Sequence, residues 1–299
     1  MSAQVAADLA AFPRRDAHVD AAGATDVGRL RTANEDAFLI ATLQRSINVH
    51  HASPGARGWF PGDPAGTLLI VADGMGGQGG GDVASSTAVN AVASHLLNVM
   101  PWVSVSPNCS PPTARTSLRG ELSTAVMAGD QIVRAEGAQA GTPRMGTTLT
   151  MAFVLCPFVY IAHVGDTRCY LLTAGQLRCL TTDHNLAQKF VDESPRPVEP
   201  PQQLQHILWN ALGAGIDRPV PEISKVEIGT GGVLLLCSDG LNKHVSDETI
   251  QSVLESREPC AARAARLIEL ANAAGGTDNI TAVVADFQGA PGESPKADQ

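Results

Sequence analysis

Short apolar runs rich in Val, Ile, Leu and Thr dominate the middle of the chain. The clearest of these runs are residues 36–41, 67–72, 147–155, 158–164, 168–172, 176–180, 222–228, 233–237 and 280–287. Runs of this length and composition, bounded by Gly, Pro, Asn or Asp, are typical of β-strands. Many follow one another after only a few residues, which predicts hairpins and therefore antiparallel pairing.

Helical periodicity occurs in two groups that are separate from most of the strand-like runs. The first group covers residues 81–100 and 117–138, and the second covers residues 249–255 and 261–274. In the second group the segment Ser246-Asp-Glu-Thr is expected to open the helix over 249–255, Pro259 lies at a helix start, and Gly275 with Gly276 is the expected stop. Helices grouped apart from hairpins favour an α+β fold over alternating βαβ units.

Length and composition indicate one domain, expected over residues 21–288. A chain of 299 residues with 44% hydrophobic content can bury a full core. Residues 1–20 are rich in alanine and residues 289–299 are small and polar, so both are expected to be flexible ends. Three further stretches, residues 44–66, 101–116 and 194–203, are rich in proline and are predicted to be loops.

The net charge and the cysteines argue against some classes of binding partner and indicate the cellular compartment. A formal charge of -9 argues against nucleic acid or an anionic membrane as the main partner. The six cysteines form no C-x-x-C pair, so neither a zinc ribbon nor a disulfide framework is expected. The N-terminus lacks the pattern of an export signal and no apolar run reaches membrane-spanning length, which predicts a cytoplasmic protein.

One pattern occurs twice: an apolar strand that runs directly into Asp-Gly, at residues 68–74 and 233–240. It places the carboxylates of Asp73 and Asp239 at strand ends, which are rigid positions for a ligand. Asp-Gly is also one of the commonest turn dipeptides, so either copy alone is more often a turn than a metal site. The case for a site therefore depends on what accompanies the two units.

Three more acids fall at the ends of predicted strands. Asp278 precedes the last strand, and Glu35 and Asp36 begin the first. Carboxylates that converge on one sheet edge repel one another unless protons or cations neutralise them, and oxygen ligands favour Mg²⁺ or Mn²⁺. Two such ions can lower the pKa of a shared water for attack on phosphorus. Arg31, four residues before Glu35, could bind two phosphate oxygens beside them.

A dinucleotide-binding fingerprint is the competing interpretation of the first Asp-Gly unit. Residues 74–79 match G-x-G-x-x-G between a strand and a helix. That interpretation requires a second parallel strand after the helix, yet the chain enters a proline-rich stretch after Met100. The pattern alone is therefore weak support for a Rossmann fold.

Nine motifs, in chain order, resemble those of the metal-dependent protein phosphatases of type 2C in their bacterial form. They are residues 26–28 (DVG), 31–36 (RTANED), 71–77 (VADGMGG), 145–148 (MGTT), 164–168 (VGDTR), 180–184 (LTTDH), 211–213 (ALG), 237–241 (CSDGL) and 277–281 (TDNIT). The resemblance covers about residues 22–287. It implies a four-layer α-β-β-α sandwich of two antiparallel sheets flanked by helix pairs, and hydrolysis of phosphoserine and phosphothreonine in proteins.

The resemblance implies a binuclear Mn²⁺ or Mg²⁺ centre, and the family's functional residues are carried over to the matching positions of this chain. Asp73 would bridge both ions, the Gly74 carbonyl would complete one, and Asp239 and Asp278 would hold the other. Glu35 and Asp36 would act largely through coordinated water, and Arg31 would bind the substrate phosphate. Expected partners are phosphorylated proteins, including a Ser/Thr kinase or its targets in signalling, and the expected state is a monomer.

The chain departs from the family pattern in ways that limit the transfer. Bacterial relatives often carry an acid just before the Gly-Thr-Thr segment, whereas residues 140–144 contain none, which puts a third ion in doubt. Asp166 is interpreted as a structural turn residue of a hairpin, and His184 is as often structural as catalytic. The alternative function is a catalytically silent phosphatase-like module that binds a phosphoprotein partner.

Overall fold

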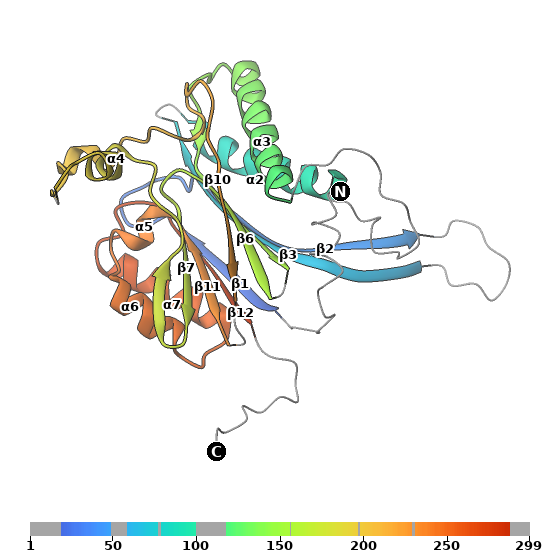
Figure 1. Ribbon diagram of the computed structural model, residues 1–299. Coiled ribbons are helices and arrows are strands. Elements are labelled where there is room, and N and C mark those ends of the chain that lie inside the picture. Colours follow the sequence, from blue (N-terminus) through green and yellow to red (C-terminus); the bar gives the residue numbers. More distant parts are fainter. Residues whose placement is uncertain are drawn as a thin grey trace, which may run out of the picture.

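The computed structural model describes residues 19–48, 59–76, 79–99, 118–155, 157–196, 198–228 and 231–287. Two antiparallel sheets pack face to face, and each carries helices on its outer side (Figure 1). The α+β class and the four-layer sandwich are therefore confirmed, and the antiparallel strands exclude the dinucleotide-binding alternative. Within the described residues, no helix is long and apolar enough to span a bilayer.

The seven-stranded sheet has the order β10-β6-β5-β3-β4-β9, with β2 also paired to β3. Its strands are β2 (Asp36–Asn48), β3 (Trp59–Met75), β4 (Gly146–Thr147), β5 (Leu149–Leu155), β6 (Phe158–Val164), β9 (Leu212–Gly213) and β10 (Glu222–Glu227). The five-stranded sheet has the order β1-β12-β11-β7-β8. Its strands are β1 (Val19–Asp26), β7 (Arg168–Thr173), β8 (Gln176–Cys179), β11 (Val233–Cys237) and β12 (Ile280–Phe287).

Most of the helices cover the two outer faces, whereas one protrudes from the sandwich (Figure 1). In chain order they are α2 (Gly81–Val99), α3 (Leu118–Ala140), the protruding α4 (Leu186–Asp192), α5 (Asp239–Asn242), α6 (Asp247–Leu254) and α7 (Cys260–Ala273), with a 3₁₀ turn at Gln202–Leu204. Helices α2 and α3 pack on the seven-stranded sheet, whereas α5, α6 and α7 pack on the other (Figure 1). The helix that was expected to open at Ser246-Asp-Glu-Thr is confirmed, but it begins at Asp247 and not at Thr249, because the Ser246 side chain caps it by accepting a hydrogen bond from the backbone N–H of Thr249.

Alternation along the central strands divides the core into three layers. On β3, Leu68 and Ile70 face the helices α2 and α3, while Leu69 and Val71 face the second sheet. On β11, Leu234 joins the layer between the sheets. Each fully buried side chain of this kind stabilises the fold by about 1.5–3 kcal/mol. Because β3 and β11 are buried on both faces, their sequences are continuous apolar runs. The polar residues at their ends lie at one edge of the sandwich, which we call the rim.

Two expectations about strand limits were wrong. Residues 44–66 were predicted to be a loop, yet β2 and β3 continue as a two-stranded ribbon in which Gln44 pairs with Pro64 and Asn48 with Trp59. Register shifts between Leu43 and Ser46 accommodate the prolines, which lack the N–H that a regular ladder needs. In addition, β1 was not predicted, and it begins inside the segment that was expected to be flexible.

The remaining loop predictions fall largely outside these elements. Residues 101–116 and 49–58 lie outside the described residues, as do residues 1–18 and 288–299. In the third loop, residues 194–196 and 198–201 have no regular structure before the 3₁₀ turn begins.

Candidate metal centre

The predicted site residues meet at one end of the sandwich because of how the central strands pair. Asp36 begins β2 and lies directly opposite Asp73 near the end of β3 in the antiparallel register. Asp239 follows β11, and Asp278 precedes β12. Since β11 and β12 are also antiparallel, with Cys237 opposite Ala282, the end of one strand lies beside the start of the other. Four acids that are far apart in sequence are thus brought to one rim.

Hydroxyl groups from the second sheet hold the carboxylate of Asp36. Its Oδ2 accepts hydrogen bonds from Ser238 Oγ and from Thr281 Oγ1, both at 2.7 Å. Its Oδ1 is buried and has no hydrogen-bond partner, and the same is true of Oδ1 of Asp239. A buried charged oxygen without a partner is costly. These two atoms therefore favour a cation at the rim.

The electrostatics of the rim reflect crowding of negative charge. Burial, followed by the charges of Asp36 and Asp239, raises the pKa of Asp73 well above its ordinary value. Burial also raises the pKa of Asp36 to about 7, although the hydroxyls of Ser238 and Thr281 oppose this shift. Carboxyls that resist ionisation together become stable as anions when a divalent cation lies between them. The donor set, which is all oxygen, suits Mg²⁺ or Mn²⁺.

Asn279 fixes the segment that carries Glu35. Its Oδ1 accepts from the backbone N–H of Glu35 at 2.7 Å, and its Nδ2 donates to the carbonyls of Val27 and Ala33, both at 2.9 Å. Burial raises the pKa of the Glu35 carboxyl, and the charge of Arg31 opposes that rise. Glu35 is thereby placed next to the acids of the rim.

Arg31 lies at the open side of the rim. Its Nη2 donates to Oδ2 of Asp278 at 2.9 Å, and its side chain is 50% exposed. The guanidinium has five N–H donors in total. It can therefore hold Asp278 and still offer donors to a phosphate.

Both Asp-Gly units are sites of close backbone approach, and neither glycine has a positive φ. A Cβ on Gly74 would lie 2.0 Å from the carbonyl oxygen of Gly81 and 2.6 Å from that of Glu35. A Cβ on Gly240 would lie 2.1 Å from the carbonyl oxygen of Asn279. The turn interpretation is wrong for both units. Each glycine lies where the backbone of a neighbouring segment comes too close to leave room for a side chain.

Two further residues belong to this rim, although the sequence patterns do not place either of them there. Asp166 lies between β6 and β7, which belong to different sheets, so the hairpin interpretation was wrong. Burial, followed by the charge of Asp239, raises the pKa of Asp166 to about 7. Lys243 forms an ion pair with Oδ2 of Asp239. The Gly-Asp-Thr-Arg segment signalled a tight connection, but only the pairing of distant strands places its carboxyl here.

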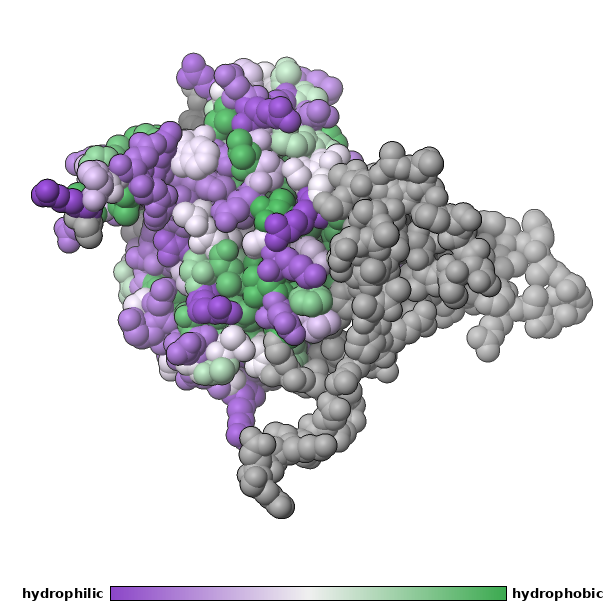
Figure 2. Space-filling model, in the orientation of Figure 1, coloured by the Kyte–Doolittle hydropathy of each residue, from purple (hydrophilic) through white to green (hydrophobic). Residues whose placement is uncertain are grey.

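His184 has a structural role in this arrangement. Its Nδ1 accepts from the backbone N–H of Gly165 at 3.1 Å and from Nδ2 of Asn210 at 3.0 Å. Its ring packs on that of Trp209, with centroids 4.9 Å apart. Trp209 lies after α4, in a part of the chain with several exposed apolar side chains. The segment that protrudes from the sandwich and contains α4 has both hydrophobic and hydrophilic surface (Figure 2).

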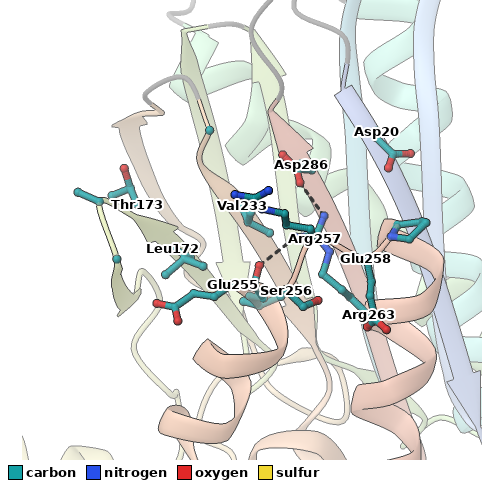
Figure 3. A pocket seen from close by; sticks show the side chains of 15 residues that line it. Asp20, Leu172, Thr173, Val233, Glu255, Ser256, Arg257, Glu258, Arg263 and Asp286 are labelled. Atoms are coloured by element: carbon teal, nitrogen blue, oxygen red, sulfur yellow. Dashed lines mark hydrogen bonds and ion pairs between the residues drawn. The ribbon is translucent and has the colours of Figure 1, made fainter. Parts of the chain in front are cut away.

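The rim is an open carboxylate cluster. No group of three or more His, Cys, Asp or Glu side chains in the described part of the chain closes around a single point. An open arrangement fits ions that keep several waters and take few protein ligands each. A hollow of about 720 Å³ lies elsewhere, where β11 begins and β12 ends, and is lined by Arg257, Arg263 and Asp286 among others (Figure 3). It is one strand length from the acids and is not the candidate site.

Comparison with known proteins identifies relatives of the whole arrangement. A family model described as Protein phosphatase 2C matches residues 58–284. The serine/threonine protein phosphatase PstP of Mycobacterium tuberculosis is 38% identical over 223 residues, which are 73% of this chain and 40% of that protein. The chain therefore spans less than half the length of this relative. The serine/threonine phosphatase stp of Listeria welshimeri is 33% identical over 88% of this chain and 93% of its own length.

A solved structure gives the same result for the fold. The catalytic domain of PstP in complex with two manganese ions superposes with a TM-score of 0.67 at 32% identity. The match covers 90% of this chain and 98% of the solved one.

Proposed function

Since the chain belongs to the protein phosphatase 2C family, we propose that it hydrolyses phosphoserine and phosphothreonine in proteins with two Mn²⁺ or Mg²⁺ ions. The observation that carries this proposal is the convergence of Asp36, Asp73, Asp239 and Asp278 on one rim with Arg31 beside them. The manganese complex of the PstP catalytic domain supports the choice of ions.

We propose the ligands that the resemblance to the family implies, at the positions of this chain that match its motifs. Asp73, the Gly74 carbonyl, Asp239 and Asp278 would hold the two ions. Glu35 and Asp36 would act through coordinated water. When bound, the ions neutralise the carboxylates and lower the pKa of water for attack on phosphorus. The unpartnered Oδ1 atoms of Asp36 and Asp239 support this assignment.

The chain's own residues bind and orient the substrate. Arg31 would donate to the phosphate oxygens while its contact with Asp278 fixes the direction of the guanidinium. The hydrogen bond that Asn279 accepts from the backbone of Glu35 keeps Glu35 against the rim, where its carboxylate would hold a coordinated water. No Ser, Cys or Asp nucleophile with a paired base was recognised in the sequence, so we propose direct attack by water.

We also propose a domain range, a location and partners for the chain. We propose one catalytic domain over residues 21–288, to which Val19 and Asp20 of β1 are to be added. A cytoplasmic location fits the described cysteines Cys169, Cys179, Cys237 and Cys260, which are free thiols. The proposed partners are phosphorylated proteins, including a Ser/Thr kinase or its targets, and the proposed state is a monomer.

The test is phosphate release from a phosphothreonine peptide by chelator-treated protein to which Mn²⁺ is returned. We expect activity with Mn²⁺, none with excess chelator, and a loss of about 100-fold or more in kcat/KM for Asp239→Asn. Asp192→Asn, which changes an exposed aspartate of α4, is the matched control and should keep wild-type activity.

The alternative function predicts a different outcome. A silent phosphoprotein-binding module would bind the peptide and release no phosphate, whether or not Mn²⁺ is present. Binding of Mn²⁺ without phosphate release would overturn the enzymatic proposal and favour that module.

A further inference from the structure

Lys243 is a cation that the fold itself places inside the acidic rim. It follows the short helix α5, four residues after Asp239, so its side chain reaches back over one helical turn. Its Nζ pairs with Oδ2 of Asp239 and lies 3.4 Å from Nδ1 of His206. With a carboxylate on one side and an imidazole on the other, the ammonium has a defined position.

The charges around Lys243 differ from those around a surface lysine. Burial opposes its charge, but the carboxylates of Asp239, Asp166 and Asp278 raise the pKa of Lys243 above its ordinary value. Its side chain is 31% exposed and that of Asp239 is 13% exposed. By contrast, Lys189 and Glu193 have the same i,i+4 spacing, but they are 50% and 71% exposed with 3.9 Å between their charged atoms. The pair at the rim is therefore screened much less by solvent.

The two oxygens of Asp239 have different surroundings. Oδ2 is occupied by the ammonium of Lys243, whereas Oδ1 is buried without a partner. Oδ1 therefore remains available for an ion shared with the other acids. The charge of Asp239 raises the pKa of the Asp166 carboxyl and the charge of Lys243 opposes that rise, so the ammonium lies in the field of both acids.

We propose that Lys243 is a positioning residue that holds Oδ2 of Asp239 and takes the place of a further cation, so that the centre binds two divalent ions. This inference rests on the proposed function, because it requires a divalent centre at Asp239. The ammonium also repels any ion that approaches Asp166. Removing its charge opens this position to a divalent cation.

The experiment is a charge series at position 243 with Mn²⁺ binding as the readout. Chelator-treated wild type, Lys243→Arg, Lys243→Gln and Lys243→Glu are titrated with Mn²⁺ by calorimetry, after circular dichroism has shown each variant to be folded. We expect two ions for wild type and for Lys243→Arg, which keeps the charge. Lys243→Gln should bind a third ion or bind its weakest ion roughly tenfold more tightly, and Lys243→Glu should exceed that change.

Lys189→Gln is the matched control, since it removes an i,i+4 lysine far more exposed than Lys243, and it should bind Mn²⁺ as wild type does. Equal stoichiometry and affinities within twofold across the whole charge series would overturn the role of Lys243 and leave the proposed centre intact. A wild type that binds no Mn²⁺ would instead remove the proposed centre, and this inference with it. If Lys243→Gln does not fold, the comparison of Lys243→Arg with Lys243→Glu decides the question.

Discussion

At the scale of single residues, the buried amide of Asn279 joins the segment before β2 to the start of β12. Its Oδ1 accepts one backbone hydrogen bond and its Nδ2 donates two, so all three contacts depend on the orientation of one side chain. The side chain is 5% exposed. Polar groups left without partners at such a site cost about 1–3 kcal/mol each.

Asn279→Asp tests these hydrogen bonds most directly, because it keeps the shape of the side chain and removes its N–H donors. The new carboxylate can still accept from Glu35, but it replaces the donor that faces the carbonyls of Val27 and Ala33. We expect the free energy of unfolding in urea to fall by about 2–4 kcal/mol. Asn98→Asp, at an exposed asparagine of α2 that makes one hydrogen bond, should change it by less than about 0.5 kcal/mol. Similar effects of both changes would contradict the role given to Asn279.

His163 gives the fold a pH dependence of its own. Burial, together with the neighbouring His184, lowers the pKa of His163 to about 3, whereas the ordinary value is about 6.5. Its Nδ1 lies 2.8 Å from Thr150 Oγ1 and its Nε2 lies 3.0 Å from the Thr182 carbonyl oxygen. Between these two pKa values the unfolded chain binds a proton that the folded chain does not, so stability falls as pH falls.

Replacing His163 with Gln isolates this contribution. The free energy of unfolding of wild type should fall relative to that of His163→Gln by about 1.4 kcal/mol per pH unit between roughly pH 6 and pH 4. Urea unfolding of both proteins across this range measures the difference, in which the contributions of the carboxyls cancel. If the difference in the free energy of unfolding between wild type and His163→Gln does not change with pH, the imidazole of His163 is not buried in its neutral form.

At the scale of elements, the end of β3 and the start of α2 must approach closely for the rim to form. The backbone N–H of Gly74 donates to the carbonyl of Glu35 at 3.0 Å, and Gly81 opens α2 against the same glycine. The atoms nearest to a Cβ at Gly74 are backbone carbonyls, which cannot move aside as a side-chain end can.

Gly74→Ala should therefore destabilise the fold by about 1–3 kcal/mol and weaken Mn²⁺ binding, since it separates β3 from α2. Gly76→Ala is the matched control two residues further on, where the nearest atom to a Cβ is 3.4 Å away. Urea unfolding and Mn²⁺ titration of both variants make the comparison. If Gly74→Ala and Gly76→Ala have the same stability and the same Mn²⁺ affinity, the close approach of β3 and α2 at Gly74 is not needed for this Asp-Gly unit.

At the scale of the whole molecule, the sequence predicts most elements because apolar alternation and helix caps are local signals. The continuous apolar run that became β11 and the cap at Ser246 are examples. Local signals could not tell that β6 and β7 lie in different sheets, which is why Asp166 was misassigned. They also could not place Lys243, whose role depends on charges that come from other strands.

The proposed function requires that carboxylates from both sheets hold a pair of divalent ions at one rim. Anomalous diffraction at the manganese absorption edge, from crystals grown with Mn²⁺, tests it directly. We expect two strong peaks within coordination distance of Asp73, Asp239 and Asp278, on the side of the rim where Arg31 lies. Well-ordered crystals with no peak there, or with manganese bound only elsewhere, would show that these carboxylates do not form a metal centre.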